Sequence, residues 1–177
     1  MNLKGRIFLN TGKLNLAKDI FSEVLKLEEN NVEAEFGLAE LDIASGRVIT
    51  AENRYENVLL VSPESRKALL SLVLINDNAG NLQKAEFYLR QALKYYSDNP
   101  FVRFTAADHF HKTNNIDESL YHLKTALFLQ PDFLEASILL CEIYMKEKKY
   151  NEITKEIEKI LSNYDDEFIL WYLLGRA

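Results

Sequence analysis

Apolar and polar positions along this chain follow the period of α-helices, and the whole pattern recurs every 34 residues. Within each copy, apolar residues lie at positions i, i+4, i+7 and i+8, which form one stripe of an amphipathic helix. Five copies align without insertion or deletion: residues 12–25, 46–59, 80–93, 114–127 and 148–161. The stripe ends on a leucine in every copy: Leu25, Leu59, Leu93, Leu127 and Leu161. We therefore expect one helix over each segment.

Another helical pattern precedes each of these segments, as in residues 100–113 and 133–147. It carries its own column of small residues: Gly5, Ala39, Val73, Ala107, Cys141 and Gly175. The later helix also has a small column, Ala17, Ala51, Ala85 and Ser119, with Ile153 of the fifth copy as the exception. Small side chains on facing stripes let two helices cross closely. The sequence therefore predicts a first and a second helix in each copy, packed against each other.

The turns between the two helices have a conserved chemistry across the copies. Gly12, Gly46, Gly80 and Asn114 fall there, where a helix end favours a residue that tolerates positive φ, while the fifth copy has Lys148. We also predict helix starts at Asn99–Pro100 and Ser62–Pro63, with a capping side chain before a first-turn proline. Asp132 with Glu135 is interpreted as a capping-box variant.

A 34-residue helix–turn–helix with these columns resembles the tetratricopeptide repeat (TPR) family, whose first-helix signature Trp-x-x-Leu-Gly matches Trp171, Leu174 and Gly175. The resemblance covers the whole chain. It implies an all-α fold, a right-handed superhelical TPR solenoid of antiparallel helix pairs. We expect one array with five repeats and the first helix of a sixth, divided approximately as 1–31, 32–65, 66–99, 100–133, 134–167 and 168–177. Asp42 and Asn76 depart from a column that is otherwise aromatic.

The ends of the chain fall inside repeats, so the last helix presents apolar residues that no following helix covers. These residues are Phe168, Trp171, Tyr172 and Leu173. Two explanations are open: the chain is a fragment of a longer array, or another copy closes the end. An uncovered apolar patch is unusual for a monomer. We therefore expect self-association through the chain ends.

The family resemblance implies that the first helices line a concave groove in which an extended or helical ligand lies. By column, this groove consists of Glu33, Phe36, Glu40, Ile43, Lys67, Leu70, Leu74, Asp77, Phe101, Phe104, Asp108, His111, Glu135, Ile138, Glu142 and Met145. An apolar strip edged with carboxylates suits a protein or peptide that is apolar and carries Lys or Arg. The alternative is that Phe36 and Phe104 pack against adjacent helices and the acids are merely solvated.

Some TPR proteins hold the C-terminal carboxylate of a ligand with a clamp of Lys, Asn and Arg. The matching columns here contain Phe36, Glu40, Ser71, Phe101 and Thr105. These residues offer no cation to a carboxylate, so the sequence argues against this mode of binding.

No residue pattern indicates catalysis or a cofactor. His109 and His111 lie two apart, so on a helix they point about 200° away from each other and cannot chelate one metal ion. Cys141 occupies a small-residue column and is interpreted as a buried helix contact. No nucleotide-binding, zinc-protease or nucleophile motif occurs in the sequence. We predict a protein that is not an enzyme and binds neither metal nor cofactor.

Composition narrows the partner class and little else. A net charge of −6 argues against nucleic acid, which requires a basic surface. The apolar run at residues 168–177 is about half of the ~20 residues that span a bilayer, so no membrane insertion is expected. No signal peptide is visible, which favours the cytoplasm, with the periplasm open for a fragment. Three functions are open: a peptide-binding scaffold, a structural module that self-associates through its terminal helices, and a regulatory TPR segment of a larger protein.

Overall fold

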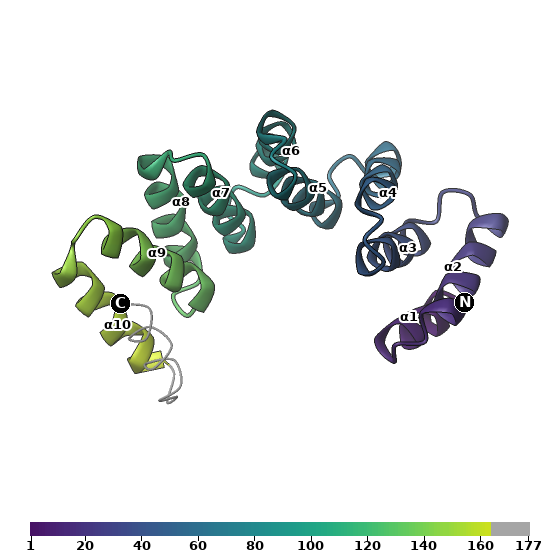
Figure 1. Cartoon of the computed structure of the whole chain (residues 1–177), viewed down its shortest axis with the longest axis horizontal. Helices are drawn as coiled ribbons and strands as arrows, with labels where there is room; N and C mark the ends of the chain where they lie inside the picture. Colours follow the sequence, from purple (N-terminus) through teal and green to yellow (C-terminus); the bar gives the residue numbers. More distant parts are fainter. Residues whose placement is uncertain (164–177) are drawn as a thin grey trace. The chain divides into compact units, whose positions relative to one another are not determined.

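The computed structural model describes residues 1–163, with side chains to residue 159, and this part of the chain folds into ten helices without a strand (Figure 1). The helices are α1 (Asn2–Asn10), α2 (Leu14–Leu27), α3 (Val32–Ala44), α4 (Val48–Val61), α5 (Arg66–Asn78), α6 (Leu82–Tyr95), α7 (Pro100–Lys112), α8 (Ile116–Leu129), α9 (Leu134–Lys146) and α10 (Tyr150–Asn163). Odd-numbered helices are the predicted first helices, and even-numbered helices are the second. The eleventh helix, predicted at 168–177, lies outside the described residues.

The chain divides into two compact units, Met1–Tyr95 and Tyr96–Ala177. The first unit contains α1 to α6, and the second contains α7 to α10. Within each unit, a first helix packs against its own second helix, and that second helix packs against the next first helix, as α2 does against α3 and α8 against α9. This succession is the all-α arrangement of helix pairs that the sequence predicts.

Each repeat joins the next through the same four-residue turn, called here the link turn. Its fourth residue donates a backbone N–H to the carbonyl of its first residue, from Asn31 to Glu28 (3.0 Å), Ser65 to Ser62 (2.9 Å), Asn99 to Tyr96 (3.1 Å) and Phe133 to Gln130 (3.2 Å). The next helix then starts one residue later. The first helices α3, α5, α7 and α9 therefore begin at residues 32, 66, 100 and 134, where the predicted repeats begin.

The link turn explains which of the predicted caps form. Asn99 caps α7 as predicted, since its side-chain oxygen accepts from the backbone N–H groups of Phe101 and Val102, with Pro100 in the first turn. The Ser62–Pro63 prediction is wrong because Pro63 is the second residue of a link turn, and α5 starts at Arg66.

The capping box predicted from Asp132 and Glu135 is wrong for the same reason. Pro131 is the second residue of its link turn, so the residue that precedes α9 is Phe133, and no side chain caps that helix.

The turn inside each repeat adopts the predicted left-handed backbone. The φ angles are +72°, +74° and +76° at Gly12, Gly46 and Gly80, +59° at Asn114 and +58° at Lys148. Glycine has no Cβ to clash in this conformation, and asparagine tolerates it. Lys148 adopts it without either advantage, so the turn geometry is imposed by the two helices.

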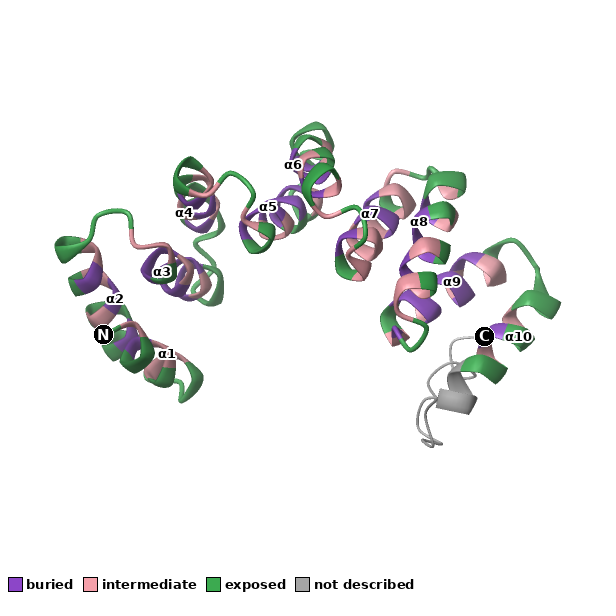
Figure 2. Ribbon diagram, turned by 180° about the vertical axis from the view of Figure 1, so that it is seen from behind, coloured by how far each residue is buried: buried purple, intermediate pink, exposed green. Residues whose placement is uncertain are grey.

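The predicted small-residue columns form the helix contacts in both units. All described members of the first-helix column are buried: Gly5, Ala39, Val73, Ala107 and Cys141. Ala17, Ala51, Ala85 and Ser119 of the second-helix column are also buried. Figure 2 shows that buried residues follow the facing sides of the helices while the opposite sides are exposed. Close helix crossing therefore rests on the residues that the repeat pattern identifies.

The core of the first unit is built around the ring of Phe21, which is fully buried. Gly5 of α1 and Gly37 of α3 contact the ring from two helices: a Cβ added at Gly5 would lie 2.6 Å from Phe21 Cε1, and one added at Gly37 would be closer still. The two glycines therefore make room for an aromatic ring between α1 and α3.

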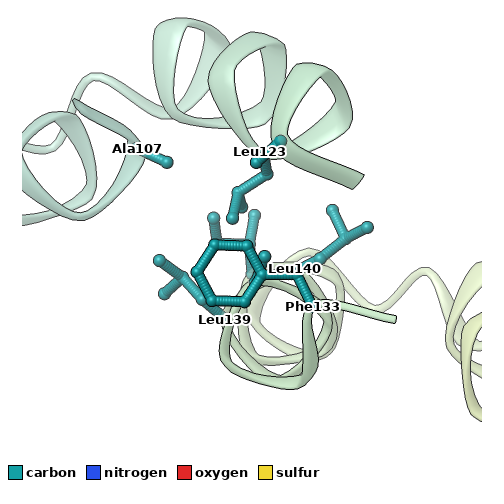
Figure 3. Close-up of a cluster of buried hydrophobic side chains, with 8 residues drawn as sticks. Ala107, Leu123, Phe133, Leu139 and Leu140 are labelled. Atoms are coloured by element: carbon teal, nitrogen blue, oxygen red, sulfur yellow. The ribbon is translucent and has the colours of Figure 1, made fainter. Parts of the chain in front are cut away.

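The core of the second unit lies where α9 packs on α7 and α8 (Figure 3). Phe133, Leu139 and Leu140 meet Leu123 of α8 and Ala107 of α7 in one cluster of buried side chains. Phe133 precedes α9 and is 3% exposed, so the link turn itself contributes an aromatic ring to the core.

Candidate functional site

The sixteen groove residues predicted from the sequence all lie on first helices, four each on α3, α5, α7 and α9. None of the sixteen is buried: each is half-buried or exposed. They therefore form a solvent-facing stripe on each helix, which we call the first-helix surface. The stripes of α3 and α5 belong to the first unit and those of α7 and α9 to the second, so the two parts are described separately.

In the first unit, this surface combines an aromatic ring with a cation and two exposed aliphatic residues. The ring of Phe36 lies 6.0 Å from that of Tyr55, and Lys67 Nζ lies 4.5 Å from the Phe36 ring centroid. Ile43 and Leu74 are 42% and 53% exposed. An aromatic–cation pair beside exposed aliphatic side chains can contact an apolar ligand without rearrangement of the core.

Glu40 joins three first helices through ion pairs. Its carboxylate accepts from Arg6 Nη1 of α1 at 3.0 Å and from Lys67 Nζ of α5 at 2.6 Å. Burial raises the pKa of Glu40, but the hydrogen bonds from Lys67 and Arg6 outweigh burial, so the pKa is lowered overall. The side chains of Arg6, Glu40 and Lys67 together carry one net positive charge, whereas Glu33 and Asp77 add carboxylates to this part of the surface.

Arg6 was not among the predicted site residues. It lies 34 residues before Glu40 and so belongs to the same column. Extending the column into the incomplete first repeat would have identified it.

In the second unit, the first-helix surface has an aromatic cluster at its centre. The rings of Phe101 and Phe104 lie 4.9 Å and 5.1 Å from the ring of Phe133. Phe104 is half-buried by this packing, whereas Phe101 remains 52% exposed. Phe101 is therefore an apolar contact held in place by a buried ring beneath it.

Two polar residues of this half, Asp108 and His111, are already engaged with neighbouring cations. Asp108 accepts from Lys112 Nζ at 2.7 Å, and His111 Nε2 lies 3.1 Å from Lys146 Nζ of α9. Burial, followed by the charge of Lys146, lowers the pKa of His111. His111 is accordingly neutral at pH 7 and can accept the lysine hydrogen bond.

A buried polar network, which sequence reasoning did not find, explains the departure at Asp42. Arg54 of α4 donates to Glu35 (Nη1 to Oε2, 2.9 Å) and to Asp42 (Nε to Oδ2, 2.7 Å), and Arg47 also donates to Asp42 at 2.8 Å. Asp42 is 6% exposed. Both carboxylates face guanidinium groups, so this cluster holds the helix pair together and has no carboxylate left for catalysis.

Equivalent positions carry polar pairs in two other repeats. Arg103 Nη1 lies 3.2 Å from Nδ1 of the buried His122, and Ser137 Oγ donates to Glu156 Oε1 at 3.0 Å. Each pair is 19 residues apart, as Glu35 and Arg54 are, and so joins the first and second helix of one repeat. The sequence places these pairs in two columns, one on the first helix and one on the second. The polar pairs become visible only when the two columns are compared repeat by repeat.

The remaining reactive groups show no catalytic arrangement. Cys141 is 1% exposed, and burial raises the pKa of its thiol to about 11, so it is a protonated helix contact at neutral pH, in agreement with its predicted role. Within residues 1–163, no cluster of three or more His, Cys, Asp or Glu side chains is arranged to hold a metal ion.

Comparison with known proteins identifies the family. The family model described as the ARM repeat of tetratricopeptide repeat protein 21 matches residues 1–153. This chain is a tetratricopeptide repeat protein. Its curated relatives include the Bacillus subtilis (strain 168) TPR repeat-containing protein YpiA, which is 26% identical over 139 residues, and the human protein O-mannosyl-transferase TMTC3, which is 23% identical over 171 residues.

The TPR chain spans a minor part of both relatives. The alignment covers 78% of the chain and 33% of YpiA, and 92% of the chain and 18% of TMTC3. The transferase named in TMTC3 is therefore a much longer protein than the region that resembles this chain.

Solved structures confirm the all-α TPR fold. A TPR protein from Parabacteroides merdae ATCC 43184 superposes with a TM-score of 0.80 at 22% identity, covering 99% of this chain and 68% of that one. YrrB, described as a TPR protein with an unusual peptide-binding site, superposes with a TM-score of 0.71 at 15% identity, covering 97% and 88%. Proteins of this fold are generally non-catalytic scaffolds for protein–protein interaction.

The described TPR helices were also compared with the requirements of a bilayer. None of those in residues 1–163 has both the length and the apolar composition to cross a membrane.

Proposed function

We propose that this TPR chain is a non-catalytic scaffold that binds a peptide or helical segment of a protein partner on its first-helix surface. The observation that carries the proposal is the exposure of large apolar residues there. Leu74 and Phe101 are 53% and 52% exposed although each lies on a helix whose other faces are packed. An apolar ligand bound to either unit would remove the exposed side chain of that unit from water, which stabilises a complex by about 25 cal/mol per Å² of apolar surface.

The charge that we propose for the ligand follows from two carboxylates. Glu33 and Glu135 occupy equivalent positions in the first turns of α3 and α9, and neither forms an ion pair within the described part of the chain. Glu40 and Asp108 are paired internally, so a ligand cation would have to displace Lys67 or Lys112 to reach them. The proposed ligand is therefore mainly apolar and places Lys or Arg near Glu33 or Glu135.

Phage display against the whole chain, followed by affinity measurements on the selected peptides, tests the proposal. Leu74→Ser should weaken peptides that bind the first unit, and Phe101→Ser peptides that bind the second unit, by about tenfold, equivalent to about 1.4 kcal/mol. Ile49→Ser is the matched control, because Ile49 is a 76% exposed aliphatic residue on the second helix α4. Equal affinity of all three variants for every selected peptide would exclude binding on the first-helix surface.

We also propose a second candidate function, self-association through a terminal helix, which one observation on α1 favours. Leu3 and Ile7 are 76% and 53% exposed on α1, four residues apart and hence on one face. The other residues predicted for this role, Phe168, Trp171, Tyr172 and Leu173, lie outside the described residues. The third alternative, a regulatory segment within a longer protein, stays a prediction.

A further inference from the structure

We propose a second binding surface on the first unit, an apolar hollow at the edge formed by α2, α3 and α4, that takes an apolar side chain flanked by Lys or Arg from a protein partner. The hollow, called here the edge hollow, has a volume of about 420 Å³ and is lined by Leu25, Glu29, Val32, Val58, Leu60 and Val61 among others. It lies at the C-terminal ends of α2 and α4 and the N-terminal end of α3, and none of its lining residues belongs to the first-helix surface.

The apolar part of the hollow is accessible and formed in advance. Val58 is buried and forms part of the packed wall, while Leu60 and Val61 at the rim are 83% and 48% exposed. A volume of this size falls in the range of about 300–1,000 Å³ that is typical of ligand pockets. One aliphatic side chain of a partner would therefore be enclosed by residues that already hold their positions.

The carboxylates beside the hollow favour a partner that carries a positive charge. A second hollow of about 620 Å³ adjoins it, shares Glu29 and Val32 with it, and is also lined by Glu28 and Glu33. No Lys, Arg or His is among the residues that line either hollow. Glu29 and Glu33 form no side-chain hydrogen bond or ion pair within residues 1–163. Their carboxylates therefore remain available to Lys or Arg of a partner.

Helix stability accounts for only part of this acidic cluster. Glu33 and Glu35 lie in the first turn of α3, where carboxylates are favourable. Glu28 and Glu29 instead follow the C-terminus of α2, where a carboxylate is unfavourable. Of the four glutamates within residues 28–35, Glu35 pairs with Arg54, while Glu28, Glu29 and Glu33 form no ion pair within the described residues. Folding brings these carboxylates close together, and a cation of a partner would relieve the repulsion between them.

The next repeat shows that neither the acid nor the apolar rim is required by the fold. Thirty-four residues on, Glu29 is replaced by Pro63, Val32 by Arg66 and Leu60 by Lys94. The same helix geometry is thus compatible with a basic edge, and the acidic apolar edge is not repeated in the next pair of repeats.

Nuclear magnetic resonance mapping on the whole ¹⁵N-labelled chain tests the inference. The probe is a short synthetic peptide in which Lys and Leu alternate, compared with one in which Glu replaces Lys and one in which Ser replaces Leu. We expect amide shifts at residues 25–32 and 57–61, which include no residue of the first-helix surface, with the Lys–Leu peptide and none with the other two. Shifts confined to the first-helix surface, or no shifts at all, would overturn the edge hollow, and the former would still support the proposed function.

Two variants with a matched control separate binding from folding. Glu29→Pro removes the carboxylate but introduces the residue found in two other link turns, and Leu60→Lys introduces the residue found at position 94. Each should weaken the Lys–Leu peptide by about fivefold or more, while Glu23→Gln, an exposed carboxylate of α2 outside the hollow, should change affinity less than about twofold. Unchanged affinity in Glu29→Pro and Leu60→Lys, with circular dichroism showing folded proteins, would refute the inference.

Discussion

At the scale of single residues, the repeats share one backbone geometry, but the side chains that face each other between repeats are matched in size. One second-helix column and one first-helix column of the following repeat face each other as Phe21 with Gly37, Tyr55 with Ser71 and Leu123 with Leu139. The Phe21 ring faces a residue without a side chain, the Tyr55 hydroxyl hydrogen-bonds to the Ser71 hydroxyl, and the two leucines belong to one buried cluster. One column read alone would suggest that its position accepts many residue types, but each residue is matched to the one that it faces.

Gly37→Ala should destabilise the chain by about 1–3 kcal/mol, because the new Cβ would overlap the buried Phe21 ring. Phe21→Leu, which introduces the residue found at positions 89 and 123, should offset this loss when combined with Gly37→Ala. Urea unfolding of the two single variants and the double variant measures the coupling. Strict additivity of the three values would contradict direct contact as the cause.

His122 should make the chain sensitive to mild acid. Burial, followed by the charge of Arg103, lowers its pKa to about 4 from the usual 6.5, so between these values the unfolded chain binds a proton that the folded chain does not. Its contribution is therefore complete above about pH 6.5 and decreases as pH falls towards 4, by up to about 3 kcal/mol in total.

His122→Phe isolates this effect. Phenylalanine keeps the ring that stacks on Phe110 at a 5.5 Å centroid distance but cannot titrate. Unfolding free energies measured between pH 4 and 7 should fall less steeply in His122→Phe than in the wild type. A slope that stays the same in this variant, or that changes equally in His111→Asn, would assign the acid sensitivity to other groups.

The columns predicted from the sequence located the packed residues well because packing repeats with the period of the chain. They failed for residues whose partner is particular to one repeat. Asp42 was recognised as an exception, but its contact with Arg54 depends on how two helices face each other across 12 positions. Glu40 was placed on the correct stripe, yet its pairing with Arg6 and Lys67 reduces the acidity inferred from its residue type.

At the scale of elements, the link turn fixes where the first helices begin. The residue that opens it has nearly the same backbone at three links: φ and ψ are −136° and 91° at Glu28, −134° and 82° at Ser62, and −139° and 92° at Gln130. Proline follows in the second and third of these, at Pro63 and Pro131. The helix starts could be predicted from the repeat period, but placing the capping residues at Ser62 and Asp132, which belong to the turn, produced the two wrong caps.

Glu29→Pro should stabilise the chain by about 0.4–1 kcal/mol, because proline restricts the unfolded state at a position whose backbone accepts it in two sister turns. Asn30→Pro is the control, since no link turn has proline at its third residue, and it should destabilise the chain. Thermal unfolding followed by circular dichroism compares both with the wild type. A lower melting temperature for Glu29→Pro would show that this turn differs from the other two.

At the scale of the whole molecule, one first-helix column is buried on α3, α5 and α9 and exposed on α1. Leu41, Ile75 and Ile143 are 3%, 8% and 1% exposed, and each lies on a first helix that follows another helix pair. Ile7 belongs to the same column on α1 and is 53% exposed. The face that is internal elsewhere is therefore an external surface at α1.

The chain should accordingly self-associate through α1 as its concentration rises, because pairing would cover Leu3 and Ile7. Sedimentation equilibrium across micromolar to millimolar concentrations should show a mass above that of one chain, and Ile7→Ser should shift the distribution towards the monomer. Ile49→Ser, which removes an exposed isoleucine from α4, should leave it unchanged. A wild-type chain that is monomeric throughout would rule out this form of assembly.

The uniform link turn also has a genetic consequence. Deleting codons 66–99 would join Ser65 to Pro100 and place the turn that ends at Ser65 directly before α7, as the turn that ends at Asn99 does now. The link turn before α7 would therefore keep its geometry after the deletion. The deletion would instead remove hydrogen bonds between the deleted repeat and the repeat before it. In these bonds, Asn76 and Lys84 donate to Glu52, and Tyr88 donates to Glu56. Unequal crossing-over in this gene would therefore be constrained by the side-chain hydrogen bonds between repeats and not by the link turns.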